Sequence, residues 1–229
     1  MSEKIQELAT IMDHMRPHII FHIGPIPVTS TVVNTWIIMA LLFLFFFWLS
    51  RNLRYFPRGV QHIPELLLEF FGNLLEEAMG KEGRRYLPLV ATLFIFILSL
   101  NLAWLVPTMK PPTMDLSTTA AFGVTTIILV QLIGIRKKGL VGYIKHFFSP
   151  MPFLFPLNVV EELVKPVSLS LRLFGNIFGE KMVVTILLIL VPFLLPTPVM
   201  LLGLLMGLIQ AFVFTLLTIT YIANFIHGH

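Results

Sequence analysis

Long apolar runs, separated by short basic or proline-containing segments, dominate the chain. The run at 31–50 contains no charged residue and is followed at once by Arg51, Arg54 and Arg58. A helix needs about 20 apolar residues to cross the roughly 30 Å hydrocarbon layer of a bilayer. The pattern therefore predicts a first membrane span over residues 31–50.

Residues 61–79 follow a different pattern, in which glutamates recur among leucines and phenylalanines. Glu65, Glu69, Glu76 and Glu77 are the acidic positions. This alternation is typical of an amphipathic helix that lies in the membrane interface. We expect such an interfacial helix at 61–79.

Two further apolar runs predict the second and third spans, at 86–106 and 117–135. Pro107 follows the first of them directly. Asp115 precedes the second at a position that favours an N-cap, where a carboxylate accepts a hydrogen bond from the first free backbone N–H groups.

The last two predicted helices, 158–190 and 198–226, are longer than a membrane requires. At 1.5 Å per residue each is about 45–50 Å long. Helices of this length must tilt, bend or project beyond the hydrocarbon layer. Pro192, Pro196 and Pro198 predict the turn between them.

The basic loops predict the orientation of the chain in the membrane. Lysine and arginine concentrate at 51–58, 81–85 and 136–145. Basic loops stay in the cytoplasm, so five spans place the N-terminus outside and the C-terminus in the cytoplasm.

Composition supports this class. Of 229 residues, 56% are hydrophobic and only 12% are charged, whereas about 25% of the residues of soluble domains are charged. We predict an all-α polytopic membrane protein with about five membrane helices plus one amphipathic interfacial helix. Residues 1–30 form an outer N-terminal segment and residues 31–229 a single transmembrane domain, with a helical hairpin at 158–226.

Several classes of function are excluded. The net charge of +4 comes from the short loops, so we expect no nucleic acid as a partner. The chain contains no cysteine, which removes thiolate sites. His14, His18 and His22 are interrupted by prolines and are interpreted as solvated loop residues, so we expect no metal and no cofactor. The acidic N-terminal residues are unlike a cleavable signal peptide.

The predicted fourth membrane helix carries a stripe of polar side chains, spaced mostly three or four residues apart. Such steps keep side chains on one face of a helix. We call this set the polar stripe; it comprises Glu161, Glu162, Lys165, Ser168, Arg172, Asn176, Glu180 and Lys181.

Arg172 is the most costly member of the polar stripe. An arginine at the centre of a membrane helix costs about 2.5–3.5 kcal/mol on insertion scales, and it does not lose its proton. One interpretation is a structural ion pair with Glu180 or Glu162. The other is an ion pathway, which is the default hypothesis for an intramembrane charge.

The predicted fifth helix has one face of small residues. Gly203, Gly207 and Ala211 recur every four residues, which permits close approach of another helix. Gln210 lies near the middle of this helix, where an amide without a partner is costly. It is placed either to bond the polar stripe or to join two helices for stability.

The run from Lys165 to Asn176, KPVSLSLRLFGN, closely resembles the signature of subunit a of F-type ATP synthases. The segments 22–27, 101–116, 156–162 and 210–221 agree with the same family in order and spacing. The resemblance thus covers nearly the whole chain and is closest to bacterial members.

The resemblance implies a stator subunit without a catalytic site of its own. Such a subunit forms two ion half-channels against a ring of c-subunits, contacts the b-subunit of the peripheral stalk, and couples the flow of H⁺ or Na⁺ to rotation and ATP synthesis. The implied location is the bacterial inner membrane.

The resemblance also implies roles for individual residues. Arg172 corresponds to the essential arginine between the half-channels. Asn176, Glu180 and Gln210 are expected to take part in ion translocation with it. Expected lining residues of the half-channels are Asp115, Glu161, Glu162, Lys165, Ser168, Lys181 and Tyr221.

This chain departs from the family at one place. Many members carry a glutamate nine residues after the arginine, where this chain has Lys181, and a histidine or glutamate seven residues before the glutamine, where it has Gly203. We therefore expect Glu180 to replace the usual carboxylate and to face the space left by Gly203. Trp104 stands where a glycine is common.

Two other functions remain as alternatives. A secondary ion transporter would be expected to show broken helices and an internal repeat, which the sequence does not display. A structural membrane scaffold would use the polar stripe as a seam of buried ion pairs.

Overall fold

The computed structural model describes residues 19–23, 26–51, 62–106, 109–147, 153, 155–190 and 196–227. The longer elements are the strands β1 (Ile19–Ile23) and β2 (Ile26–Thr29) and the helices α2 (Ser30–Arg51), α3 (His62–Met79), α4 (Leu87–Asn101), α5 (Leu116–Phe147), α6 (Phe155–Leu190) and α7 (Pro196–His227). Short 3₁₀ turns occupy Gly80–Tyr86 (η2), Leu102–Leu105 (η3) and Pro112–Met114 (η4).

The predicted class, a membrane protein built from several apolar helices, is confirmed. Within the described residues, four helical stretches are long and apolar enough to cross a membrane: Ser30–Arg51, His62–Leu105, Leu116–Ile144 and Thr197–Ile226. The helix α6 is not among them, because charged residues of the polar stripe interrupt its apolar sequence. Its 36 residues nevertheless exceed the length that a membrane requires.

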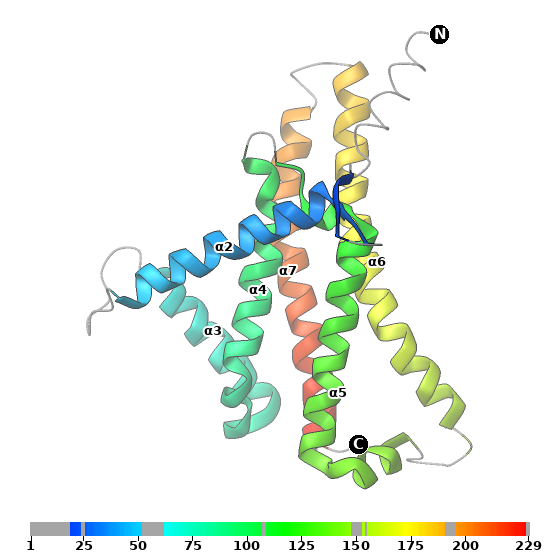
Figure 1. Ribbon diagram of the computed structural model, residues 1–229. Helices are drawn as coiled ribbons and strands as arrows, with labels where there is room; N and C mark the ends of the chain where they lie inside the picture. Colours follow the sequence, from blue (N-terminus) through cyan, green and yellow to red (C-terminus); the bar gives the residue numbers. More distant parts are fainter. Residues whose placement is uncertain are drawn as a thin grey trace.

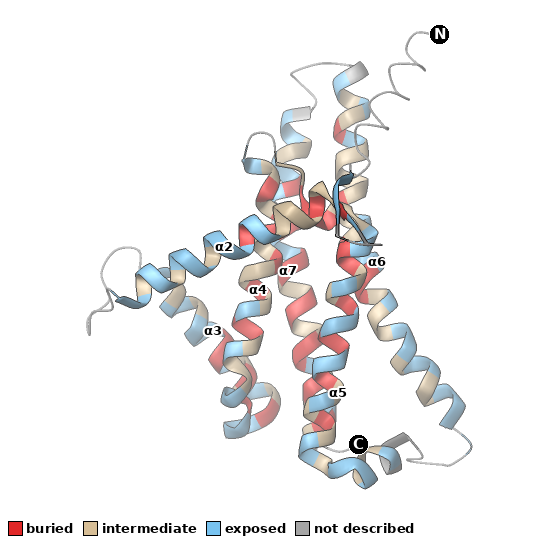
Figure 2. Ribbon diagram, viewed as in Figure 1, coloured by how far each residue is buried: buried red, intermediate tan, exposed pale blue. Residues whose placement is uncertain are grey.

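The helices α4, α5, α6 and α7 form an elongated bundle that contains the main core (Figure 1). Buried positions concentrate on the sides of α4, α5 and α7 that face one another (Figure 2). This core buries large side chains from several elements, among them Phe71, Leu75, Val90, Ile97, Val130, Leu169, Leu173, Phe214 and Ile222.

The helix α2 is mostly exposed and crosses the bundle rather than running alongside it (Figure 1). Its buried residues are Thr31 and Ile38, whereas Phe43 and Trp48 are more than half exposed. An apolar surface of this kind is suited to contact with lipid or with another membrane protein.

The helix α3 has the amphipathic character that its sequence predicts. Phe71, Leu75 and Met79, spaced four apart, are buried against the bundle, while Glu65, Glu69 and Glu77 are exposed. Whether α3 lies in the membrane interface stays a prediction.

The start of α5 agrees with the predicted N-cap. The Oδ1 atom of Asp115 accepts a hydrogen bond from the backbone N–H of Ser117 at 3.0 Å, which satisfies a donor that the helix itself leaves free. The helix continues past the expected end at 135 and turns sharply at Gly139, whose φ of 73° favours glycine.

The small hairpin of β1 and β2 was not predicted. The strands pair antiparallel, with His22 opposite Pro27 and Ile23 opposite Ile26. Prolines are rare inside strands because they cannot donate a ladder hydrogen bond. A segment that contains prolines therefore does not predict a hairpin.

Glycine allows α5 and α6 to approach each other closely. A Cβ atom at Gly123 would lie 2.3 Å from Oγ of Ser170 and 2.7 Å from the backbone oxygen of Pro166. Because the second of these is a backbone atom, the helices themselves would have to separate to admit a side chain.

We therefore expect Gly123→Ala to destabilise the protein by about 1–3 kcal/mol, the usual cost of overpacking. Gly179→Ala is the matched control, because a Cβ atom there meets nothing within 4 Å and alanine favours the helix. Thermal unfolding in detergent measures both changes. Equal midpoints for the two variants would contradict the close contact of α5 with α6.

Candidate functional site

The polar stripe on α6 divides into two clusters, with Arg172 between them. The first cluster contains Glu161, Glu162 and Lys165, and the second contains Asn176, Glu180 and Lys181. Seven or eight residues separate Lys165 and Glu180 from Arg172, which is about 10–12 Å along a helix.

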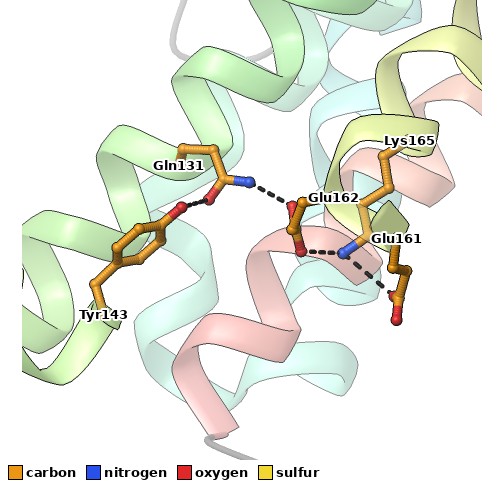
Figure 3. A network of polar contacts seen from close by, with 5 residues as sticks. All are labelled: Gln131, Tyr143, Glu161, Glu162 and Lys165. Carbon is orange, nitrogen blue, oxygen red and sulfur yellow. Dashed lines mark hydrogen bonds and ion pairs between the residues drawn. The ribbon is translucent and has the colours of Figure 1, made fainter. Parts of the chain in front are cut away.

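Glu162 is the centre of the first cluster (Figure 3). Its carboxylate accepts hydrogen bonds from Nζ of Lys165 and from Nε2 of Gln131, a residue of α5. The hydroxyl of Tyr143 donates to Oε1 of Gln131 at 2.6 Å, and Lys165 Nζ also lies 3.5 Å from Oε1 of Glu161. The cluster therefore joins α6 to both parts of α5, before and after Gly139.

A cavity of about 340 Å³ lies beside this cluster. Tyr143, Ile144, Phe155, Val159, Glu162 and Leu163 line it. Lys165 is placed 5.2 Å above the centre of the Tyr221 ring, a cation–π contact that connects the first cluster to α7.

In the second cluster, Asn176 connects α6 to α7. Its Nδ2 atom donates to Oε1 of the buried Gln210 at 2.6 Å. Gln210 thus bonds the polar stripe and at the same time joins two helices, so this hydrogen bond agrees with both interpretations of Gln210. Nδ2 of the buried Asn101 donates to the backbone oxygen of Gly207 in α7 at 3.0 Å, so α4, α7 and α6 are linked by amide side chains.

Glu180 completes the second cluster and is almost buried. Its side chain is 8% exposed, and its Oε1 atom lies 3.2 Å from Nζ of Lys181. The carboxylate packs against Gly203, where an added Cβ atom would lie 2.1 Å from the carboxyl carbon of Glu180. The structure thus places Glu180 in the space left by Gly203, while the role of Glu180 stays a prediction.

Arg172 is exposed and forms no ion pair or hydrogen bond with any residue that the structure describes. The two carboxylates considered as its partners bind lysines instead, Glu180 with Lys181 and Glu162 with Lys165. Apolar side chains elsewhere on α6, including Val167 and Leu171, are also exposed.

The remaining predicted site residues lie in several places. Asp115 accepts hydrogen bonds from the hydroxyls of Thr31 and Ser117. Ser168 is half-buried on α6.

Sequence reasoning did not select Gln131, Tyr143 or Asn101 as site residues. Gln131 and Asn101 are polar residues within apolar runs, which was a usable signal.

We expect the Asn176–Gln210 hydrogen bond to appear as a coupling energy in a double-mutant cycle with Asn176→Leu and Gln210→Leu. Hydrogen bonds between membrane helices contribute about 0.6 kcal/mol on average and up to about 1.7 kcal/mol. The free energies of unfolding of the wild type, the two single variants and the double variant in detergent give the coupling energy. If the two single losses of stability add up to the loss in the double variant, the two amides do not interact.

Comparison with known proteins identifies the family. Residues 32–223 match the family described as "ATP synthase A chain". The "ATP synthase subunit a" of Moorella thermoacetica is 77% identical over 218 residues, which cover 95% of this chain and 100% of the relative.

More distant relatives agree. "ATP synthase subunit a 1" of Syntrophotalea carbinolica is 45% identical over 84% of each chain. "ATP synthase subunit a 1" of Pelobacter propionicus is 46% identical, over 84% of this chain and 86% of the relative. With a family match over most of its length and relatives of this identity, the chain belongs to the ATP synthase A chain family.

Proposed function

We propose that the chain acts as the ion-conducting stator of an F-type ATP synthase, with Arg172 at the centre of the path. Membership of the family makes it a membrane-sector subunit that serves proton transport and ATP synthesis and is not catalytic by itself. The proposal concerns how its residues perform that role.

The observation that carries the proposal is the exposed Arg172 without a partner. An arginine in a membrane needs a counter-charge or water. Among the described residues none of the three carboxylates of the polar stripe pairs with Arg172, because Glu161 and Glu162 pair with Lys165 and Glu180 pairs with Lys181. A neighbouring subunit that presents a carboxylate satisfies Arg172. A scaffold held together by internal ion pairs would not leave this arginine exposed.

The exposed apolar side chains of α6 and α7 fit such a neighbour. Large apolar side chains on α6 and α7 are exposed, among them Leu163, Val164, Val167, Leu171, Leu201, Leu204, Leu205 and Leu208. A ring of small membrane subunits, each with one carboxylate, would cover these side chains and bring the carboxylates past Arg172 in turn. The b-subunit of the peripheral stalk is the second expected partner and holds the chain still against the ring.

A fixed cation has two effects on such a path. It stabilises the ionised form of a ring carboxylate beside it and so promotes release of the bound proton. It also repels a free proton or hydronium ion, which prevents a direct leak between the two sides. Each proton that crosses with the field gains about 2.3 kcal/mol per 100 mV, and this energy drives rotation.

The two polar clusters supply the two half-channels in this proposal. Asn176, Gln210 and Glu180 belong to the outer path, where Glu180 relays the proton, and Asp115 lies toward its mouth. Glu161, Glu162 and Lys165 belong to the inner path. The pocket beside Glu162 and Tyr143 lies next to this inner cluster.

We also propose the orientation and location of the chain. The turn between α3 and α4 and the far end of α5 lie at the end of the bundle where α7 ends (Figure 1), and Lys137 of α5 pairs with Glu82 of η2 there. Basic turns favour the cytoplasm. Five spans, an outer N-terminus and a cytoplasmic C-terminus in a bacterial inner membrane are the arrangement that we propose.

The test is ATP-driven proton pumping by the assembled complex in membrane vesicles. Arg172→Ala is expected to abolish coupled pumping while the complex still assembles, because neither the release of protons nor the barrier to leakage remains. Arg172→Lys is expected to fail as well, since an ammonium on a flexible stem lacks the planar fork of arginine.

The exposed Arg136 on α5 provides the matched control, and Arg136→Ala is expected to pump normally. Pumping near the wild-type rate by assembled Arg172→Ala would refute the assignment.

A further inference from the structure

Lys181 has an unusual position beside the proposed proton relay. Its side chain is 16% exposed, and its ammonium lies 3.2 Å from Oε1 of Glu180. The same nitrogen is 4.2 Å from the centre of the Trp104 ring. Trp104 belongs to η3, so a residue outside α6 and α7 fixes the position of the lysine.

The two oxygens of Glu180 differ because of this arrangement. Oε1 accepts the hydrogen bond from Lys181, whereas Oε2 is buried and has no hydrogen-bond partner among the described residues. Gly203 of α7 forms the wall beside the carboxylate. A carboxylate held by one oxygen against a flat wall presents the other oxygen in a defined direction.

We propose that Lys181, held on the ring of Trp104, is a positioning residue that binds Oε1 of Glu180 and leaves Oε2 as the single atom that takes up and releases the proton. The proton binds Oε2 and converts the carboxylate into a carboxylic acid, then leaves from the same oxygen to the next acceptor. Lys181 remains an ammonium throughout. The inference rests on the proposed relay role of Glu180.

The surroundings of Glu180 make Lys181 its one charged neighbour within the described structure. Gly203 from α7 and Trp104 from η3 carry no titratable group, and Arg172 is two turns away on α6. An ammonium in hydrocarbon is costly unless it is paired. The contact with Trp104 stabilises the cation without adding a second acceptor that would compete with Glu180.

The test measures ATP-driven proton pumping per assembled complex in membrane vesicles. Lys181→Met is expected to lower pumping about tenfold, given the energies of a desolvated cation–π contact and a charge-assisted hydrogen bond. Lys181→Arg keeps a cation that both binds Oε1 and stacks on the indole, and is expected to restore pumping. Lys137→Met is the control, because Lys137 forms an ion pair on an exposed surface.

Trp104 provides a second, independent variant. Trp104→Phe retains an aromatic face and is expected to pump nearly as wild type, whereas Trp104→Leu is expected to lower pumping about threefold. If Lys181→Met fails to assemble, pumping by Trp104→Phe and Trp104→Leu tests the positioning role of Lys181 instead. Equal pumping by Trp104→Phe and Trp104→Leu would overturn the positioning role.

The charge-neutral double variant Glu180→Gln/Lys181→Met separates the possible failures. It is expected to assemble and to pump no better than Glu180→Gln alone. Pumping near wild type by the double variant would refute the relay role of Glu180, and with it this inference. If Lys181→Met pumps normally and Glu180→Gln loses pumping, the positioning role of Lys181 is refuted, whereas the relay role of Glu180 is not.

Discussion

The cost of placing charge in hydrocarbon governs the arrangement of this protein. The helix α6 brings three cations and three carboxylates into an apolar bundle, and each lysine lies beside a carboxylate of the same helix. Lys165 has two glutamates and Lys181 has one, so the first cluster carries one net negative charge and the second is neutral. Arg172 holds the positive charge that balances the helix as a whole.

This distribution places a localised positive charge, Arg172, on a helix that its neighbours hold in position. The polar stripe is fixed to neighbouring elements by neutral groups: Gln131 and Tyr143 from α5, Gln210 and Tyr221 from α7, and Trp104 from η3. A preorganised environment of this kind does not need to rearrange when charge moves past it. The core of α4, α5 and α7 holds the supporting helices in place, while the face around Arg172 stays free for a partner.

Periodicity and charge were sufficient to locate the last two helices, since the ends of 158–190 and 198–226 differ from those of α6 and α7 by no more than three residues. The Asp115 cap and the Gln210 contact also followed from local rules. The β-hairpin, the turn of α5 at Gly139 and the partners of Glu162 did not. These depend on which helices become neighbours, and a single polar residue such as Gln131 does not reveal what it will meet. The choice between lysine and arginine as the partner of Glu180 likewise required the fold.

The contact of Glu180 with Gly203 has a consequence for how such a protein can change over time. Positions 180 and 203 belong to different helices but share one volume, since any side chain at 203 would occupy the place of the carboxylate. Neither position is free to vary by itself. A descendant that acquires a larger residue on α7 must first lose or shorten the residue on α6, so the carboxylate can pass from one helix to the other only through a paired exchange.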